Sequence, residues 1–189
     1  NRQEPSALIR YNRDQKPFRA EGNHPVFNVT FEDTQAYCAW ARVRLPTEAE
    51  WEFAAQGDEG RPYPWGNGFP AGILVANVAD RSLKRRVPDL ILDEVGYNTG
   101  NMSDYADASP FTAPVGAHPG DESAFGCMDM GGNVHERVQD FWGKYSANSQ
   151  VDPTGPETDD GGGPLRGGSW RMSFWATRTS SRMRYSHSQ

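Results

Sequence analysis

Two short glycine-rich runs, each closed by a tryptophan, constrain this 189-residue chain more than any other feature. The first runs from Asp129 to Trp142 and sets Asp129 and Glu136 around a Gly-Gly-Asn turn, and the second is Arg166–Trp170. Glycine bends the backbone freely, and calcium takes several oxygen ligands that include main-chain carbonyls. A single loop acid is more often solvated or a turn cap, so the pairing around the turn is what favours a cation site.

The composition favours one loop-rich domain held together by aromatic side chains. The chain has 20 Gly and 14 Pro, and only 36% of its residues are hydrophobic. Six Trp, seven Tyr and nine Phe compensate, because each aromatic side chain can bury a large area. The length is enough for one domain with a real core and short for two.

The charge pattern excludes one class of partner and leaves two interpretations of the C-terminal segment. A net charge of −6 argues against a general nucleic-acid binder. Leu165–Gln189 nevertheless contains five Arg and no acidic residue. These arginines are either solvated or structurally paired, or they form a basic wall beside a pocket for an anionic or peptide-like ligand. No apolar run reaches membrane-spanning length, and Cys38 and Cys127 fit buried small hydrophobes better than a redox or metal pair.

Local signals predict two helices. One spans 31–41, where Thr30 can cap it and Ala36, Tyr37 and Trp40 form an apolar stripe expected to face inward. The other spans Glu48 to about Ala55 behind a Thr-Glu-Ala-Glu capping box. Its inward residues are expected to be Trp51, Ala54 and Ala55.

The remaining segments predict irregular structure and short strands. Residues 77–107 are charged and lack clean periodicity, which predicts a long, partly ordered insertion. Short elements are expected at 113–115 and 134–141. A core strand is expected at 165–170, with 178–185 as its neighbour.

Histidine spacing does not indicate a clustered metal site. The four histidines show no HxH or HxxxH pattern, and the chain has no GxSxG, P-loop or GxGxxG motif. They are His24, His118, His135 and His187. His135 stands out because it lies inside the glycine turn, although a lone histidine is more often structural than catalytic.

Seven runs, in order, resemble motifs of the formylglycine-generating enzyme (sulfatase-modifying factor) family. They are Asn23-His24-Pro25-Val26, Ala36-Tyr37-Cys38-Ala39-Trp40, RLPTEAEWE at 44–52, Tyr63-Pro64-Trp65-Gly66, Ala113-Pro114-Val115, Gly132-Asn133-Val134 and Arg166-Gly167-Gly168-Ser169-Trp170. The resemblance implies an α+β, C-type-lectin-like fold that is loop-rich, with short strands and two helices. It also implies that 1–189 is a single domain, incomplete at its N-terminus and at its closing strand. Either the chain is a processed or trimmed fragment, or a companion N-terminal segment completes the fold.

The resemblance further implies two structural calcium sites. One would use Asn77, the Val78 carbonyl, Asp107 and the Ser109 carbonyl. The other would use Asp129, the Gly132 and Val134 carbonyls, and Glu136. The second set is the same cluster that the oxygen chemistry of the glycine turn already favours.

Two departures from the family pattern bear on function. The copper-binding cysteines that follow the GGSW motif are missing, because no Cys occurs after Cys127 and Met172 and Thr177 stand near those positions. Copper–thiolate chemistry is therefore not expected. His135 also stands where the family usually has Trp, which changes the lining of the expected substrate groove.

Three hypotheses follow. The first is an extracytoplasmic oxidative maturation enzyme that acts on a peptide substrate such as a siderophore precursor, similar to PvdO-type proteins of pyoverdine biosynthesis, with His135, Ser169 and Arg171 as catalytic candidates. The second is a non-catalytic ligand-binding module like the diversity-generating variable proteins, or a structural family member. The candidate ligand-binding residues are Trp170, Ser173, Phe174, Trp175, Arg178 and Tyr185. The third, a true formylglycine generator, is disfavoured by the missing cysteines.

Overall fold

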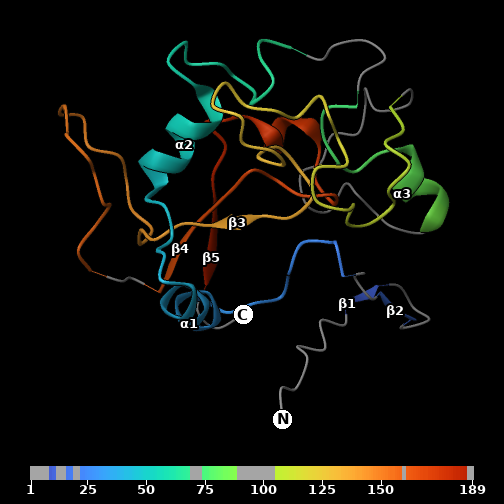
Figure 1. Cartoon of the computed structure of the whole chain (residues 1–189), viewed down its shortest axis with the longest axis horizontal. Coiled ribbons are helices and arrows are strands. Elements are labelled where there is room, and N and C mark those ends of the chain that lie inside the picture. The colour runs from blue at the N-terminus through green and yellow to red at the C-terminus, as the bar shows by residue number, and fades with distance from the viewer. Residues whose placement is uncertain are drawn as a thin grey trace.

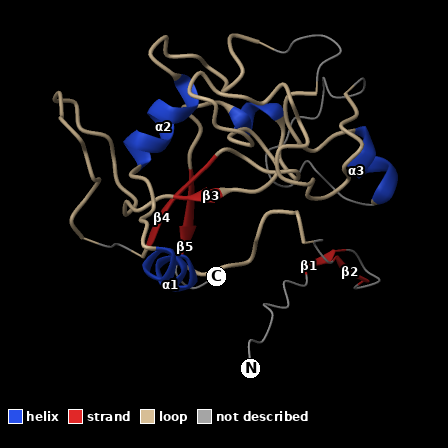
Figure 2. Ribbon diagram, in the orientation of Figure 1, coloured by secondary structure: helices blue, strands red, loops and turns tan. Residues whose placement is uncertain are grey.

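Helices and a small antiparallel sheet organise the described part of the chain, which confirms the α+β class (Figure 1). The computed structural model describes residues 9–11, 16–18, 22–68, 74–88, 105–158 and 161–186. Its α-helices are α1 (Phe31–Ala41), α2 (Glu48–Gln56) and α3 (Arg81–Arg86). Loops make up most of what surrounds them, as Figure 2 shows.

The two predicted helices begin as their sequences require. Thr30 accepts a hydrogen bond from the Asp33 amide at the start of α1, and the Asp33 carboxylate accepts one from the Thr30 amide. The same reciprocal pair joins Thr47 and Glu50 at the start of α2. These capping boxes satisfy amides that have no partner within the helix, and they confirm both predicted N-termini.

The two helices differ in what they bury. In α2, Trp51 and Ala55 are buried and Ala54 packs against them, as predicted. The expectation that α1 turns its aromatic stripe inward is wrong, because Tyr37 is 62% exposed and Trp40 is 73% exposed. Among the described residues α1 has no buried side chain, and its exposed Tyr37 and Trp40 rings contact each other, with 5.7 Å between ring centroids.

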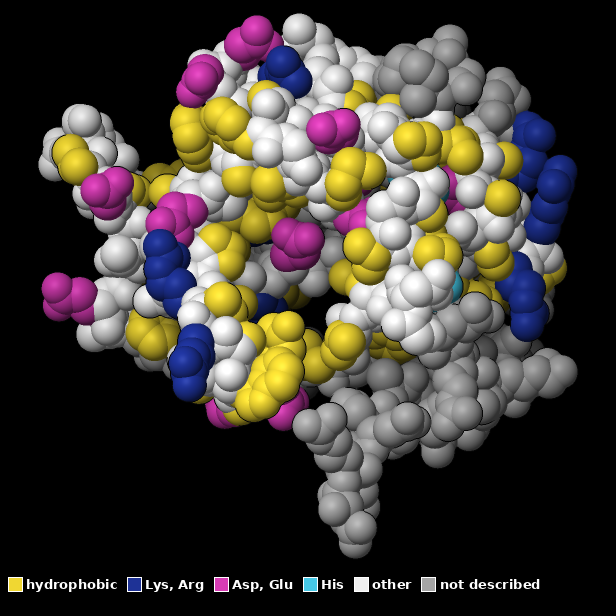
Figure 3. Space-filling model, viewed as in Figure 1, with side chains coloured by type: hydrophobic (Ala, Val, Ile, Leu, Met, Phe, Trp, Pro, Cys, Tyr) yellow, Lys and Arg dark blue, Asp and Glu magenta, His cyan; other side chains and the backbone are white. Residues whose placement is uncertain are grey.

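The expectation of only two helices is also wrong, because α3 lies inside the predicted insertion. Asp80 caps it by accepting hydrogen bonds from the Ser82 and Leu83 amides, and Leu83 is buried. The exposed side is basic, and Figure 3 shows Lys and Arg side chains gathered along this edge of the molecule. The rest of the predicted insertion, 89–104, lies outside the described residues.

A three-stranded antiparallel sheet occupies the centre of the view in Figure 1, with strand order β3-β4-β5. The strands are β3 (Glu136–Arg137), β4 (Gly162–Arg166) and β5 (Met183–Ser186). A separate antiparallel pair joins β1 (Ile9–Tyr11) and β2 (Lys16–Phe18). The predicted neighbours at 165–170 and 178–185 are therefore right in pairing but displaced in their bounds.

The expected strand at 113–115 does not form. The Ala113 amide donates to the Asn133 side chain and the Val115 amide donates to the Asn23 carbonyl, so both are used by irregular segments. Residues 174–177, which lie between the two predicted strands 165–170 and 178–185, form a short 3₁₀ helix, η2.

A buried ion-pair network joins α2 to the sheet. Arg166 is fully buried on β4, where it pairs with Glu48 at 3.2 Å and with Glu52 at 2.5 Å and also donates to the Thr179 carbonyl. Arg182 pairs with the second Glu48 oxygen at 2.5 Å and lies over the Trp142 ring. For these two arginines of the basic C-terminal segment, the interpretation as structurally paired residues is confirmed.

Candidate functional site

The glycine loop, residues 129–136, is tied to two other segments by backbone hydrogen bonds. The Gly132 amide donates to the Gly167 carbonyl at 2.7 Å, and the Asn133 amide donates to the Asn77 carbonyl at 2.8 Å. The Trp170 amide in turn donates to the Asn133 carbonyl at 2.9 Å. The two glycine-rich runs seen in the sequence therefore meet in space, and Asn77 lies against them.

The Asn133 side chain supports this arrangement from the inside. Its Oδ1 accepts hydrogen bonds from the Ala113 amide and from Asn77 Nδ2, and its Nδ2 donates to the Ala113 carbonyl. Asn133 has a φ of 57° and Asp129 a φ of 59°, a left-handed conformation that Asn and Asp tolerate better than most residues. The loop's shape thus follows from its residue types.

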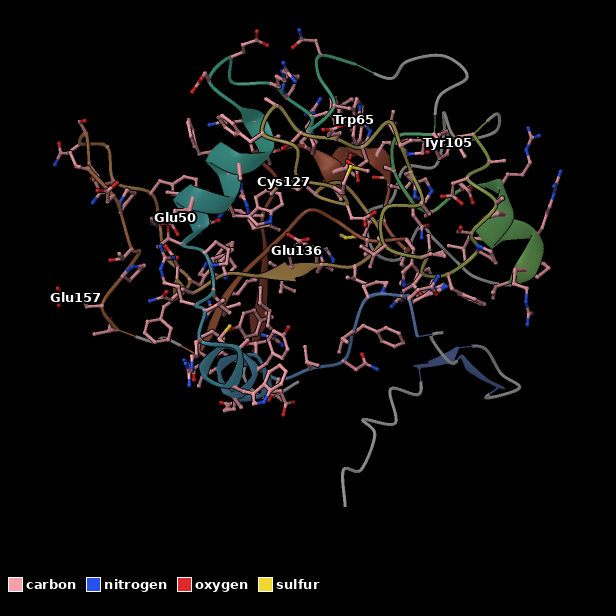
Figure 4. All side chains as sticks on the ribbon, in the orientation of Figure 1. Glu50, Trp65, Tyr105, Cys127, Glu136 and Glu157 are labelled. Carbon is pink, nitrogen blue, oxygen red and sulfur yellow. The ribbon has the colours of Figure 1, made fainter. Side chains whose placement is uncertain are left out.

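The two carboxylates of the glycine loop are each held by one neutral donor. Glu136 Oε2 accepts a hydrogen bond from Trp51 Nε1 at 2.5 Å, and Asp129 Oδ2 accepts one from the Gly116 amide at 2.6 Å. Burial raises the pKa of Glu136 to about 7, and the charge of Asp129 adds to the shift. Figure 4 labels Glu136 on β3, at the centre of the molecule.

Asp121 is a third acidic residue of this region, and sequence reasoning missed it. It is 1% exposed, and its Oδ1 has no hydrogen-bond partner. Burial, together with the charges of Asp129 and Glu136, raises its pKa to about 9. It lies in a loop whose sequence, His-Pro-Gly-Asp-Glu-Ser, reads as an ordinary turn, so no motif could have singled it out.

These features fit a cation at the glycine loop. Mutually repelling buried carboxylates and an unpartnered buried oxygen are the conditions that a bound cation relieves. In the described residues, no group of three or more His, Cys, Asp and Glu side chains could hold a metal ion on its own. Any cation here would therefore depend on main-chain carbonyls, as the predicted set with Gly132 and Val134 does.

The other predicted calcium set is also brought together. Asp107 accepts hydrogen bonds from the Val78 amide at 3.1 Å and the Ser109 amide at 2.7 Å. Asn77 Oδ1 is buried with no hydrogen-bond partner, which leaves it available to a cation. Burial, together with the nearby charge of Asp80, raises the pKa of Asp107 to about 7. The sequence did not single out Asp80.

His135 lies just before β3 and is half-buried. Burial lowers its pKa, and a hydrogen bond with the Arg166 backbone partly opposes that shift. Its Nδ1 has no hydrogen-bond partner. The imidazole is therefore neutral at pH 7, and its unpartnered Nδ1 is buried. Ser169 is buried and Arg171 is half-buried, and both follow β4 in the chain.

Half of the predicted ligand-binding residues lie in the interior. Trp170 is buried with its ring edge against Phe111, at 5.4 Å between ring centroids. Tyr185 is buried beneath the Arg137 guanidinium, 4.0 Å from its ring centroid, and Ser173 is buried as well. The prediction of all six residues as one accessible surface is therefore wrong, because these three side chains are used in packing.

The remaining residues form an accessible patch on and beside η2, which we call the η2 patch (Phe174, Trp175 and Arg178). Trp175 is 57% exposed, and the Arg178 guanidinium lies 4.1 Å from its ring centroid. Phe174 meets Tyr105 edge-on at 4.8 Å, and Tyr63 lies within 3.5 Å of Arg178 Nε.

Trp65 and Tyr105, labelled in Figure 4, lie close to the η2 patch. Trp65 stacks on Tyr63 with 5.3 Å between ring centroids, and both Trp65 and Tyr105 pack with Phe174 around Ala76 and Val78. Sequence reasoning named Trp65 only as part of a family motif and assigned it no site role. Its Tyr-Pro-Trp-Gly motif was the signal that could have placed it here.

The positions expected to carry copper-binding thiols are buried and carry none. Met172 and Thr177 are buried, and the Thr177 hydroxyl donates to the Phe174 carbonyl at 2.8 Å. Cys38 and Cys127 are half-buried free thiols on other segments.

A family model, the sulfatase-modifying factor enzyme 1-like domain, matches residues 2–189. The chain belongs to this family. Among curated relatives, the formylglycine-generating enzyme of Thermomonospora curvata is 40% identical over 144 residues, which cover 72% of this chain and 41% of that enzyme. Hercynine oxygenase of Mycolicibacterium smegmatis is 35% identical over 119 residues, which cover 61% of this chain and 21% of the oxygenase. The chain thus spans less than half of the length of these relatives.

Two solved structures support the same family membership. PvdO from Pseudomonas aeruginosa is similar with a TM-score of 0.68 and 26% identity, over 92% of this chain and 61% of PvdO. Treponema denticola variable protein 1 is similar with a TM-score of 0.56 and 25% identity, over 77% of this chain and 43% of that protein. The chain is therefore a divergent member of a family that includes oxidative enzymes. In the described residues, we find no helix with the length and hydrophobicity needed to cross a membrane.

Proposed function

We propose that this chain is part of an oxidative enzyme that modifies a peptide or peptide-like substrate outside the cytoplasm, without a copper–thiolate centre. A siderophore precursor is the substrate class that the likeness to PvdO favours. The observation that carries the proposal is the η2 patch, which stays accessible while the neighbouring thiol positions are filled by the buried Met172 and Thr177. In this proposal the chain keeps the fold of its family but carries Met172 and Thr177 in place of the copper-binding thiols.

The η2 patch suits a peptide that carries aromatic or carboxylate groups. Trp175 offers a flat apolar face, and Arg178 offers a planar cation that can pair with a carboxylate. The guanidinium is already held over the indole ring, so little side-chain freedom remains to be lost on binding. These two side chains would hold the substrate.

His135 is the candidate base of this proposal. Its lowered pKa keeps the imidazole neutral at pH 7, and its unpartnered Nδ1 can accept a proton. The hydrogen bond with the Arg166 backbone fixes the ring relative to β4. Ser169 and Arg171 would take positioning roles beside it.

Purified protein incubated in air with a linear siderophore-precursor peptide tests the proposal. Mass spectrometry should detect loss of two hydrogens or gain of oxygen. His135→Ala should lower kcat by about 100-fold or more, as expected for loss of a general base. Trp175→Ala should raise KM, whereas Trp40→Ala, which removes an exposed tryptophan from α1, should leave both constants unchanged. Full turnover by His135→Ala would exclude His135 from the mechanism.

Calcium binding is a second part of the proposal. We propose that calcium binds at the glycine loop and at the Asn77–Asp107 set, where it would stabilise the fold. The unpartnered Asn77 Oδ1 and the raised pKa values of Asp107 and Glu136 support this. The parallel bridge between Asn77 and Gly132 would connect the two sites through the backbone.

A companion segment that completes the domain is the third part. The exposed Tyr37 and Trp40 on α1, a helix without buried residues, support it. An isolated helix of this length is marginal in water, so α1 requires tertiary contacts to persist. The C-type-lectin-like topology predicted for the complete domain stays a prediction.

A non-catalytic binding module is the alternative, favoured by the likeness to the variable protein and by the exposed η2 patch. Isothermal titration with the same peptide separates the two functions. A binder should retain affinity in His135→Ala, lose it in Trp175→Ala, and leave the mass of the peptide unchanged.

A further inference from the structure

The turn from His118 to Asp121 places two unsatisfied polar atoms inside the protein. His118 is 2% exposed and Asp121 is 1% exposed, and the Asp121 amide donates to the His118 carbonyl at 3.0 Å. His118 Nδ1 and Asp121 Oδ1 have no hydrogen-bond partner. Leaving a buried polar atom unpaired is costly, so such atoms in a native fold usually face a water molecule or an ion.

The unpaired oxygen of Asp121 faces the glycine loop. It lies 3.3 Å from the position that a Cβ on Gly131 would occupy, and the Gly131 backbone donates a hydrogen bond to the same carboxyl group. Gly131 lies between Asp129 and Gly132, two members of the predicted calcium set. Asp121 therefore borders that set from a segment outside it.

The pKa shifts of Asp121 and His118 agree with this placement. Asp121 interacts unfavourably with the charges of both Asp129 and Glu136, and His118 interacts favourably with Asp129. Three side-chain carboxylates do not come close enough to enclose an ion by themselves. The geometry thus fits a carboxylate just outside the coordination shell.

We propose that Asp121 is an outer-sphere carboxylate of the calcium site in the glycine loop. Its charge adds to those of Asp129 and Glu136, its backbone partner Gly131 holds the loop in shape, and its Oδ1 accepts a hydrogen bond from a water ligand of the ion. Groups in this position orient the ligands and raise affinity without touching the metal. The inference rests on the calcium site proposed above and is independent of any catalytic activity.

Calcium titration of the purified, chelator-treated protein tests the role of Asp121. Asp121→Asn keeps nearly the same shape and an oxygen that can accept from Gly131, but it removes the charge. It should weaken calcium binding by about 10-fold, as outer-shell changes do. Glu122→Gln is the matched control, because it removes one negative charge from the adjacent, exposed position and should change affinity little. Asp121→Ser removes the same charge with a smaller side chain and should give a similar loss.

Melting temperatures separate this role from simple packing. Asp121→Asn should melt in excess chelator at or above the wild-type temperature, because it removes a buried carboxyl group that must take up a proton on folding, and should gain less on addition of calcium. A lower melting temperature in chelator with an unchanged calcium affinity would show that Asp121 is structural and overturn the proposal. Equal affinity of the wild-type and Asp121→Asn proteins, or no calcium binding by the wild type, would also overturn it.

Discussion

Gly132 approaches Asn77 so closely that a Cβ on Gly132 would lie 2.4 Å from the Asn77 carbonyl oxygen. The two residues form an isolated parallel bridge that joins the glycine loop to the segment before α3. The φ of Gly132 is 101°, a conformation that residues with a side chain rarely adopt. The bridge therefore exists only because the position is glycine.

Gly132→Ala should consequently destabilise the fold by about 3 kcal/mol or more, since it combines strain with a backbone clash. Gly60→Ala is the matched control. Gly60 has a φ of 64° with open space around it, so alanine there should cost only about 1 kcal/mol. Urea unfolding measures both. Equal costs would show that the approach to Asn77 does not limit this position.

Removing the buried cation of the α2 network should be severe. Arg166→Met removes the buried guanidinium that pairs with Glu48 and Glu52. Breaking a buried ion pair typically costs about 3–5 kcal/mol of stability. Arg44→Met breaks the exposed pair with Glu50 and should change stability little. The comparison requires only the two midpoints of denaturant unfolding. A similar midpoint for the two variants would contradict the importance of burial.

Stability of the metal-free protein should fall as pH rises from 7 to 9. The pKa of Asp121 is raised to about 9, whereas an unfolded Asp titrates near 4. The folded state therefore holds a proton that the unfolded state has already released, so the free energy of unfolding decreases with pH across that interval. Burial lowers the pKa of His118 and His135, so neither histidine changes charge above pH 7.

Melting curves in chelator across this pH range provide the measurement. Asp121→Asn should reduce the dependence most in the upper part of the range, because Asp107 and Glu136, with pKa values of about 7, titrate at its lower end. A wild-type melting temperature that rises from pH 7 to pH 9 would have the wrong sign for a buried, protonated Asp121.

Calcium should stabilise the protein, whereas magnesium should do so weakly. A ligand that binds only the folded state adds about 2.7 kcal/mol at 100 times its dissociation constant. Irregular loops with carbonyl ligands suit calcium better than magnesium, which demands a tighter octahedral shell. Scanning calorimetry with chelator, calcium and magnesium checks this, and identical melting temperatures in all three would exclude a structural calcium site.

The sequence predicted the elements whose signals are local. The capping boxes at Thr30 and Thr47 predicted the starts of α1 and α2, because the cap and its acceptor lie three residues apart. The α3 helix was missed, since six residues with one buried side chain, Leu83, leave no periodic pattern. The exposure of Trp40 was also mispredicted, because an apolar stripe does not specify what covers it.

The candidate site was predictable only where a motif carries it. Asp129 and Glu136 flank the glycine turn in the sequence, so the motif itself predicted that they lie near each other. Asp121 reaches the same region through tertiary contacts, which leave no pattern in the sequence. Trp170 and Tyr185 were mistaken for surface residues for the same reason. Their burial depends on residues far away in the sequence.

Arg166 also bears on how the chain can fold. It bonds to Glu48 and Glu52, which precede it by 118 and 114 residues. Contacts of such long range form slowly, because the intervening chain must be ordered first. During synthesis, Glu48 and Glu52 of α2 therefore cannot pair with Arg166 until the 114 to 118 residues that separate them have been made.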